Sequence, residues 1–145
     1  MKLTIELVPT TSWYTNVRSN VSKEQWDKLR NKCYFDAHYK CEICGGKGSK
    51  WPVECHEIWD YDDTNHIQKL TGLIALCPDC HTTKHPGLAA IKGKHYIVMS
   101  QLTKINNMTD IKAACYLEEC FNIWRKRSEH KWTIDISFID NYLNH

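Results

Sequence analysis

The sequence lacks any long apolar stretch. Its uninterrupted hydrophobic runs do not exceed five residues, as in segment 73–77, far fewer than the roughly 20 residues that a membrane-spanning helix needs. The residues after Met1 alternate like a strand and show neither the charged nor the apolar region of a secretion signal. We therefore expect a cytoplasmic protein that does not associate with membranes.

Glycine and proline are also scarce, and neither charge sign dominates. The 145 residues contain six Gly and four Pro and no internal repeat, which excludes collagen-like and low-complexity chains. The net charge of +2 is too small to identify a nucleic-acid partner by itself. With 42% hydrophobic residues, a chain of this length can bury one core. The sequence predicts a single α+β domain over residues 1–145.

Cysteine is the residue type present in excess. Four of the eight cysteines form two Cys-x-x-Cys pairs, Cys41 with Cys44 and Cys77 with Cys80. Disulfides are rare in a reducing compartment, whereas two such pairs supply the four thiolates that tetrahedral zinc requires. A thioredoxin-like redox pair is the rival interpretation, but the sequence lacks its βαβ pattern. We therefore expect a structural Zn²⁺ site.

Periodicity and turn residues predict flanking segments 2–38 and 94–140 around a central module of about 41–90. In order, we expect a strand over 2–8, a helix from the Ser22 capping box to about Ala37, strands over 52–59 and 66–76 with a possible bulge at Gly72, a short helix from Pro78 that Pro86-Gly87 stops, helices over 94–105 and 110–127, and a last strand over 132–138 that pairs with the first. Of the isolated cysteines, Cys33, Cys55 and Cys115 are expected in the core. The core face of the last long helix is expected to hold Ile111, Ala114, Cys115, Leu117, Phe121 and Trp124.

Three histidines form a second candidate metal site. His81 and His85 are four residues apart on the predicted short helix and so share a face. His56 lies on the strand between the cysteine pairs, which the zinc site would hold close to that helix. Three imidazoles from a strand and a helix can bind a divalent ion and leave one position open, as catalytic sites do.

The order of these motifs resembles the HNH endonucleases of bacteria and phages, also called His-Me finger or ββα-metal nucleases. The resemblance is strongest between residues 41 and 85. The residues that carry it are Cys41-x-x-Cys44, Val53-Glu-Cys-His56-Glu57-Ile58-Trp59 and Leu73-Ile-Ala-Leu-Cys77-x-x-Cys80-His81-x-x-x-His85.

The resemblance implies a ββα-metal finger held by the four-cysteine zinc site, in a bacterial cell or a phage-infected host. It implies that His56, His81 and His85 bind a second divalent ion, which is Mg²⁺, Mn²⁺, Ni²⁺ or Zn²⁺. The implied activity is hydrolysis of phosphodiester bonds in nucleic acid, with DNA as the expected substrate.

Two positions depart from the family pattern. Glu57 stands where the family usually has the histidine that acts as general base, and Gly72 stands where it has the asparagine that orients this base. A glutamate with its ordinary pKa of about 4.3 is a weak base unless burial raises that pKa. In an alternative register, His56 is the base and Glu54 or Glu57 binds the metal. The competing hypothesis is a catalytically inactive zinc module that binds nucleic acid or a protein partner.

Basic residues gather near the C-terminus. Residues 125–131 contain four bases and one acid, a density that suits either phosphate contacts or a solvated helix end. We expect the following residues to contact nucleic acid, the last three from positions near the predicted metal-binding helix: Arg125, Lys126, Arg127, Lys131, Lys84, Lys92 and Lys94.

Overall fold

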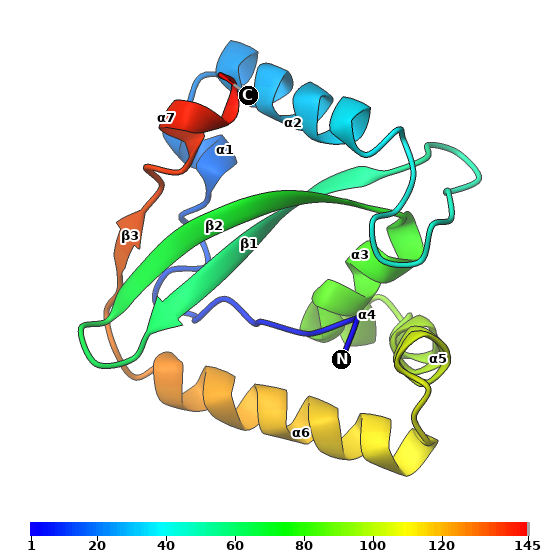
Figure 1. The fold of residues 1–145 in the computed structure, drawn as a ribbon. Coiled ribbons are helices and arrows are strands. Elements are labelled where there is room, and N and C mark those ends of the chain that lie inside the picture. The colour runs from blue at the N-terminus through cyan, green and yellow to red at the C-terminus, as the bar shows by residue number, and fades with distance from the viewer. Residues whose placement is uncertain (145) are drawn as a thin grey trace.

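A β-hairpin lies at the centre of the computed structural model, which describes residues 1–144, and helices surround it (Figure 1). The elements are α1 (Val17–Asn20), α2 (Lys23–Asp36), β1 (Glu54–Asp62), β2 (Ile67–Leu76), α3 (Pro78–Lys84), α4 (Pro86–Ile91), α5 (His95–Asn106), α6 (Asp110–Arg127), β3 (Thr133–Asp135) and α7 (Ile139–Tyr142). This arrangement confirms a mixed α+β single small domain. None of the helices within residues 1–144 is long and apolar enough to cross a membrane.

The hairpin is antiparallel and runs from the pair Glu54–Leu76 to the pair Asp62–Ile67. Its register shifts after Ile58, which leaves Thr71 of β2 without a partner on β1, directly beside the expected bulge at Gly72. The sheet order is β1-β2-β3, so β1 is an edge strand.

Helix ends follow their capping and proline residues. The side chains of Ser22 and Thr109 accept hydrogen bonds from backbone amides of the first turns of α2 and α6, as their sequence signatures predict. Helix α3 ends before Pro86 as expected, but Pro86 is also the first residue of α4, a helix that the sequence did not predict. Proline favours this position since its fixed φ suits a first turn whose N–H has no partner inside the helix.

The N-terminal segment is not a strand, in contrast to the prediction for residues 2–8. Side chains of α5 and α6 bond its backbone instead. The Asn106 side chain donates to Leu3 O and accepts from Leu3 N, both at 2.8 Å. The Tyr116 hydroxyl accepts from Ile5 N at 2.8 Å, and Trp124 Nε1 donates to Val8 O at 3.0 Å. Alternation indicated an extended chain correctly but could not identify its partner.

The last strand is shorter than predicted and pairs elsewhere. It spans Thr133–Asp135 and runs parallel to β2, with Thr133 opposite Ile67. The prediction that it pairs with the N-terminal segment is wrong, because α5 and α6 have already taken that segment's polar groups.

The buried face of α6 is rotated from the predicted one. Ala113, Leu117 and Cys120 are buried, whereas Ile111 is 77% exposed and Ala114 and Cys115 are exposed too. The helix turns Tyr116 and Trp124 toward the N-terminal segment because their polar atoms bond its backbone. Of the other predicted core cysteines, Cys33 is buried and Cys55 is half-buried beside it.

Asn106→Ala should destabilise the protein, because it leaves both backbone groups of the buried Leu3 without partners. We expect the free energy of unfolding to fall by about 1–3 kcal/mol, the usual cost of unsatisfied buried polar groups. Denaturant unfolding of this variant and of Asn31→Ala, an exposed position on α2, measures the effect. Equal stabilities of the two variants would show that the N-terminal segment is not held by Asn106.

Candidate metal centres

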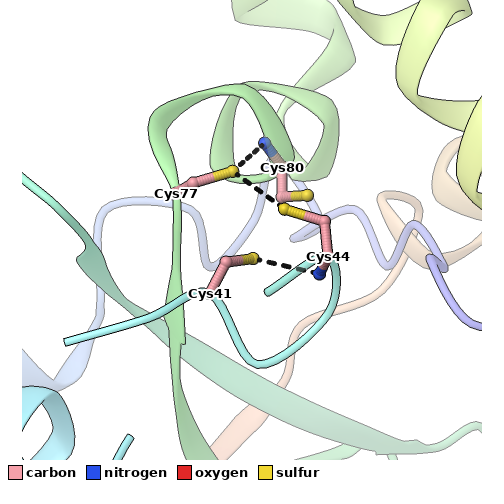
Figure 2. Close-up of side chains that lie close together, drawn as sticks. All are labelled: Cys41, Cys44, Cys77 and Cys80. Carbon is pink, nitrogen blue, oxygen red and sulfur yellow. Dashed lines mark hydrogen bonds between the residues drawn. The ribbon is translucent and has the colours of Figure 1, made fainter. Parts of the chain in front are cut away.

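The four cysteines of the two pairs meet at one point. Cys41 and Cys44 lie in the loop after α2, and Cys77 and Cys80 lie at the junction of β2 and α3 (Figure 2). Their sulfur atoms all lie within 4.8 Å of one another. The Sγ atoms of Cys44 and Cys77 are 3.6 Å apart, close to the separation of about 3.8 Å that tetrahedral Zn–S bonds of about 2.3 Å give. The predicted four-cysteine cluster is confirmed, and its geometry is compatible with zinc.

Backbone amides around the cluster point at the sulfur atoms. Cys44 N donates to Cys41 Sγ at 3.5 Å and Cys80 N to Cys77 Sγ at 3.4 Å (Figure 2). Gly46 N donates to Cys44 Sγ at 3.3 Å, in a turn where Gly45 has a φ of +75°. These donors stabilise thiolates, the form that binds metal. A hydrogen bond between the Cys80 and Cys41 side chains lowers the pKa of the Cys41 thiol and raises the pKa of the Cys80 thiol.

Two contacts around the cluster have no signal in the sequence. Gln101 of α5 donates to Cys80 Sγ at 3.3 Å, a contact between segments that only the fold brings together. Glu42 makes two hydrogen bonds to Ala75 of β2. Its backbone amide donates to Ala75 O, and its carboxylate accepts from Ala75 N. The loop that carries Cys41 and Cys44 is therefore held against β2 by hydrogen bonds as well as by the sulfur cluster.

Cys44→Ser should release zinc and unfold the chain, because binding energy at such a site is folding energy. Cys115→Ser is the matched control, since Cys115 is exposed and lies outside the cluster. Metal content by mass spectrometry and thermal melts on both variants measure the difference. A Cys44→Ser chain that melts with the parent and holds as much zinc would contradict the structural role.

The structure also brings the three predicted histidines together. His56 lies on β1, His81 lies in α3, and His85 is the residue that ends α3. Their ring centroids are 5.0–5.3 Å apart, and one ring nitrogen of each lies within 4.8 Å of the others. His81 Nε2 and His85 Nε2 are 3.2 Å apart. Two nitrogens bound tetrahedrally to one ion at about 2.05 Å would lie about 3.3 Å apart.

The surroundings favour the neutral form of two of these imidazoles, His56 and His85. Burial lowers the pKa of His56 to about 2, with smaller contributions from the charges of His85, His81 and Lys84. Burial, followed by the charges of His81 and Lys84, lowers the pKa of His85 to about 4. A neutral imidazole has the free lone pair that a metal ion requires.

Glu54 orients one of the three rings. Its Oε1 atom lies 3.4 Å from His81 Nδ1, on the opposite side of the ring from the nitrogen that faces His85. A carboxylate behind a histidine fixes the tautomer that leaves the other nitrogen free for a metal. The alternative register, in which His56 is the base and Glu54 or Glu57 binds the metal, stays a prediction; in this structure Glu54 contacts the outer nitrogen of His81.

Glu57 is placed beside the histidines but bonded elsewhere. Its Oε1 accepts a hydrogen bond of 2.8 Å from the amide of Val17, at the first residue of α1. Burial raises its pKa, and hydrogen bonds from the amides of Val17 and Arg18 and from Trp59 oppose that rise. The Glu57 carboxylate is not among the potential metal-binding atoms of the cluster that His56, His81 and His85 form. Gly72 pairs with Ile58 on the hairpin and offers no polar side chain.

Two hollows flank the histidines. The first has a volume of about 610 Å³, and His56, Glu57, His81 and His85 line it together with apolar side chains. The second has a volume of about 660 Å³ and lies among α1, α2 and residues 39–55. The residues that line both are Arg18, Trp26, Cys55 and His81.

The predicted basic residues lie apart from these hollows. Arg127 donates to both carboxylate oxygens of Asp63 and stacks 4.4 Å from the Tyr61 ring centroid. Lys84 is buried, and its ammonium contacts Glu6 at 3.1 Å. Arg125 donates to Asn122 on its own helix. The exposed residues of this set are Arg125, Lys92, Lys94, Lys126 and Lys131.

Comparisons of the chain with family models, with curated proteins and with solved structures found no match.

Proposed function

We propose that this protein is a metal-dependent HNH-type endonuclease that hydrolyses phosphodiester bonds in nucleic acid, with DNA as its substrate. The observation that carries the proposal is the convergence of His56, His81 and His85 on one point, with Glu54 behind His81. A β-hairpin followed directly by a helix supplies all three rings, as the resemblance to a ββα-metal finger implies.

The donor set suits a catalytic ion. Three imidazoles leave one or more positions open for phosphate and water, whereas a structural site is closed by four protein ligands. Imidazole nitrogen favours transition ions such as Zn²⁺, Ni²⁺ and Mn²⁺ over Mg²⁺, which prefers oxygen. An ion bound here supplies positive charge for the scissile phosphate and for the leaving oxygen.

Glu57 is the proposed general base. It takes a proton from the water that attacks phosphorus, while the bond from phosphorus to the leaving oxygen breaks. Its raised pKa makes it a stronger base than an exposed glutamate, and the Val17 amide holds one of its oxygens in place. The alternative, with His56 as base, is less supported because the His56 ring is buried against the two other imidazoles.

Glu57→Gln should reduce cleavage about 100-fold or more, the usual contribution of a general base. A glutamine oxygen can still accept the bond from Val17 N, so the fold and the bound metal should remain. Plasmid cleavage with Mg²⁺, Mn²⁺, Ni²⁺ and Zn²⁺ added in turn measures the loss, with Glu118→Gln, an exposed position on α6, as control. Cleavage equal to that of the parent would transfer the base role to His56.

His85→Ala should leave a folded chain that keeps its zinc but loses a second, weaker divalent ion and all cleavage. The reason is that His85 ends α3 and contributes a ring nitrogen to the cluster, but it is not part of the four-cysteine site. His95→Ala, an exposed histidine at the start of α5, is the control.

Metal counting by mass spectrometry, thermal melts and the cleavage assay are applied to both histidine variants. If His85→Ala melts as early as Cys44→Ser, the histidines are structural and the nuclease proposal fails. If no added ion supports cleavage by the folded parent, the chain is the inactive zinc module instead.

A further inference from the structure

The second hollow has no role in the proposed chemistry, although His81 lines it. It adjoins the first hollow at the four residues that line both, and the two hollows together are called the path below. We propose that this path binds single-stranded nucleic acid, with unpaired bases stacked on aromatic side chains in both hollows and the backbone drawn past the histidines by Arg18 and Lys23. The inference rests on the proposed function and adds the substrate class.

Charge in the second hollow favours a polyanion. Neither Arg18 nor Lys23 makes an ion pair within residues 1–144, and both are exposed. Asp27 contacts Arg30 at 2.9 Å, and Glu54 contacts the His81 ring. The cations that line the second hollow, Arg18, Lys23 and Arg30, outnumber these two acids. This excess of positive charge is the electrostatic condition for phosphate binding.

Exposed aromatic rings line both hollows of the path. Trp51 is 50% exposed and Tyr39 is 46% exposed at the second hollow, and Trp13 is 68% exposed at the first. Such rings stack on any base, because every base has a π face. They can reach that face only when the bases are unpaired, since a duplex keeps its bases stacked on each other. The combination of free cations with aromatic rings is the general pattern of single-strand binding sites.

The C-terminal basic residues do not share this path. Lys126 and Arg127 line a third hollow with Asp63 and His130, and none of the histidines of the cluster lines it. If the substrate crosses the histidines, Arg18 and Lys23 are the cations on its route. This gives the experiment a matched pair of variants, Arg18→Ala/Lys23→Ala against Arg125→Ala/Lys126→Ala.

The test is fluorescence anisotropy of the full-length, zinc-loaded protein with a 5′-labelled oligonucleotide of about 20 nucleotides, either single-stranded or annealed to its complement. No second metal is added, so that cleavage does not contribute. We expect single strands to bind at least about tenfold more tightly than the duplex. Arg18→Ala/Lys23→Ala should lower the log–log salt slope by about 1.4, which is about 0.7 for each phosphate that the variant no longer neutralises. Arg125→Ala/Lys126→Ala should leave the slope unchanged.

Trp51→Ala should weaken single-strand binding about tenfold and leave duplex binding unchanged, whereas Trp51→Phe should restore most of the affinity because it keeps a ring. Zinc content and thermal melts identify any variant that has not kept its fold. Tighter duplex binding, a Trp51→Ala variant that binds single strands as the parent does, or a slope that falls only in the Arg125→Ala/Lys126→Ala variant would each overturn the inference.

The two proposals fail separately. A protein that binds single strands as described but cleaves nothing with any added metal keeps this inference and refutes the nuclease. A protein that cleaves but binds the duplex more tightly keeps the nuclease and refutes this inference.

Discussion

The meeting of the two Cys-x-x-Cys pairs is the constraint on which the rest of the structure depends. It joins the loop after α2 to the junction of β2 and α3, two segments that share no helix or strand. That junction sets the direction in which α3 leaves the sheet, and α3 carries His81 and His85. The hairpin brings His56 to the same place from β1. The histidine cluster thus depends on the cysteine cluster for its geometry. The two differ in ligand type, since one offers sulfur and the other nitrogen.

Local patterns in the sequence were sufficient for the parts of the structure that local forces determine. The spacing of Cys41, Cys44, Cys77 and Cys80 identified their cluster because a Cys-x-x-Cys turn places two sulfurs side by side whatever surrounds it. Ser22 and Thr109 marked helix starts, since a capping side chain bonds an amide three residues away. His81 and His85 were assigned to one face because four residues make about one helical turn.

Features that depend on distant partners escaped prediction. The N-terminal residues alternate like a strand, yet Asn106 and Tyr116 take their backbone groups, more than one hundred residues along the chain. The same contacts rotate α6 and expose Ile111. Glu54 could be considered only as a metal ligand from sequence, because its position behind His81 depends on how β1 lies against α3. Arg127 was likewise expected to contact nucleic acid. In the structure it bonds Asp63 and so joins the end of the hairpin to α6.

Cys77 has two roles at once, and they link the sulfur cluster to the start of α3. Its sulfur belongs to the four-cysteine cluster, and it also caps α3 by accepting from Cys80 N. A thiolate in that place also suits the positive end of the helix that carries His81 and His85. A zinc ion held by the four sulfurs would therefore also secure the start of α3 and, with it, the position of the His81 ring. A chain that loses such an ion would lose the helix start and the meeting of the histidines together.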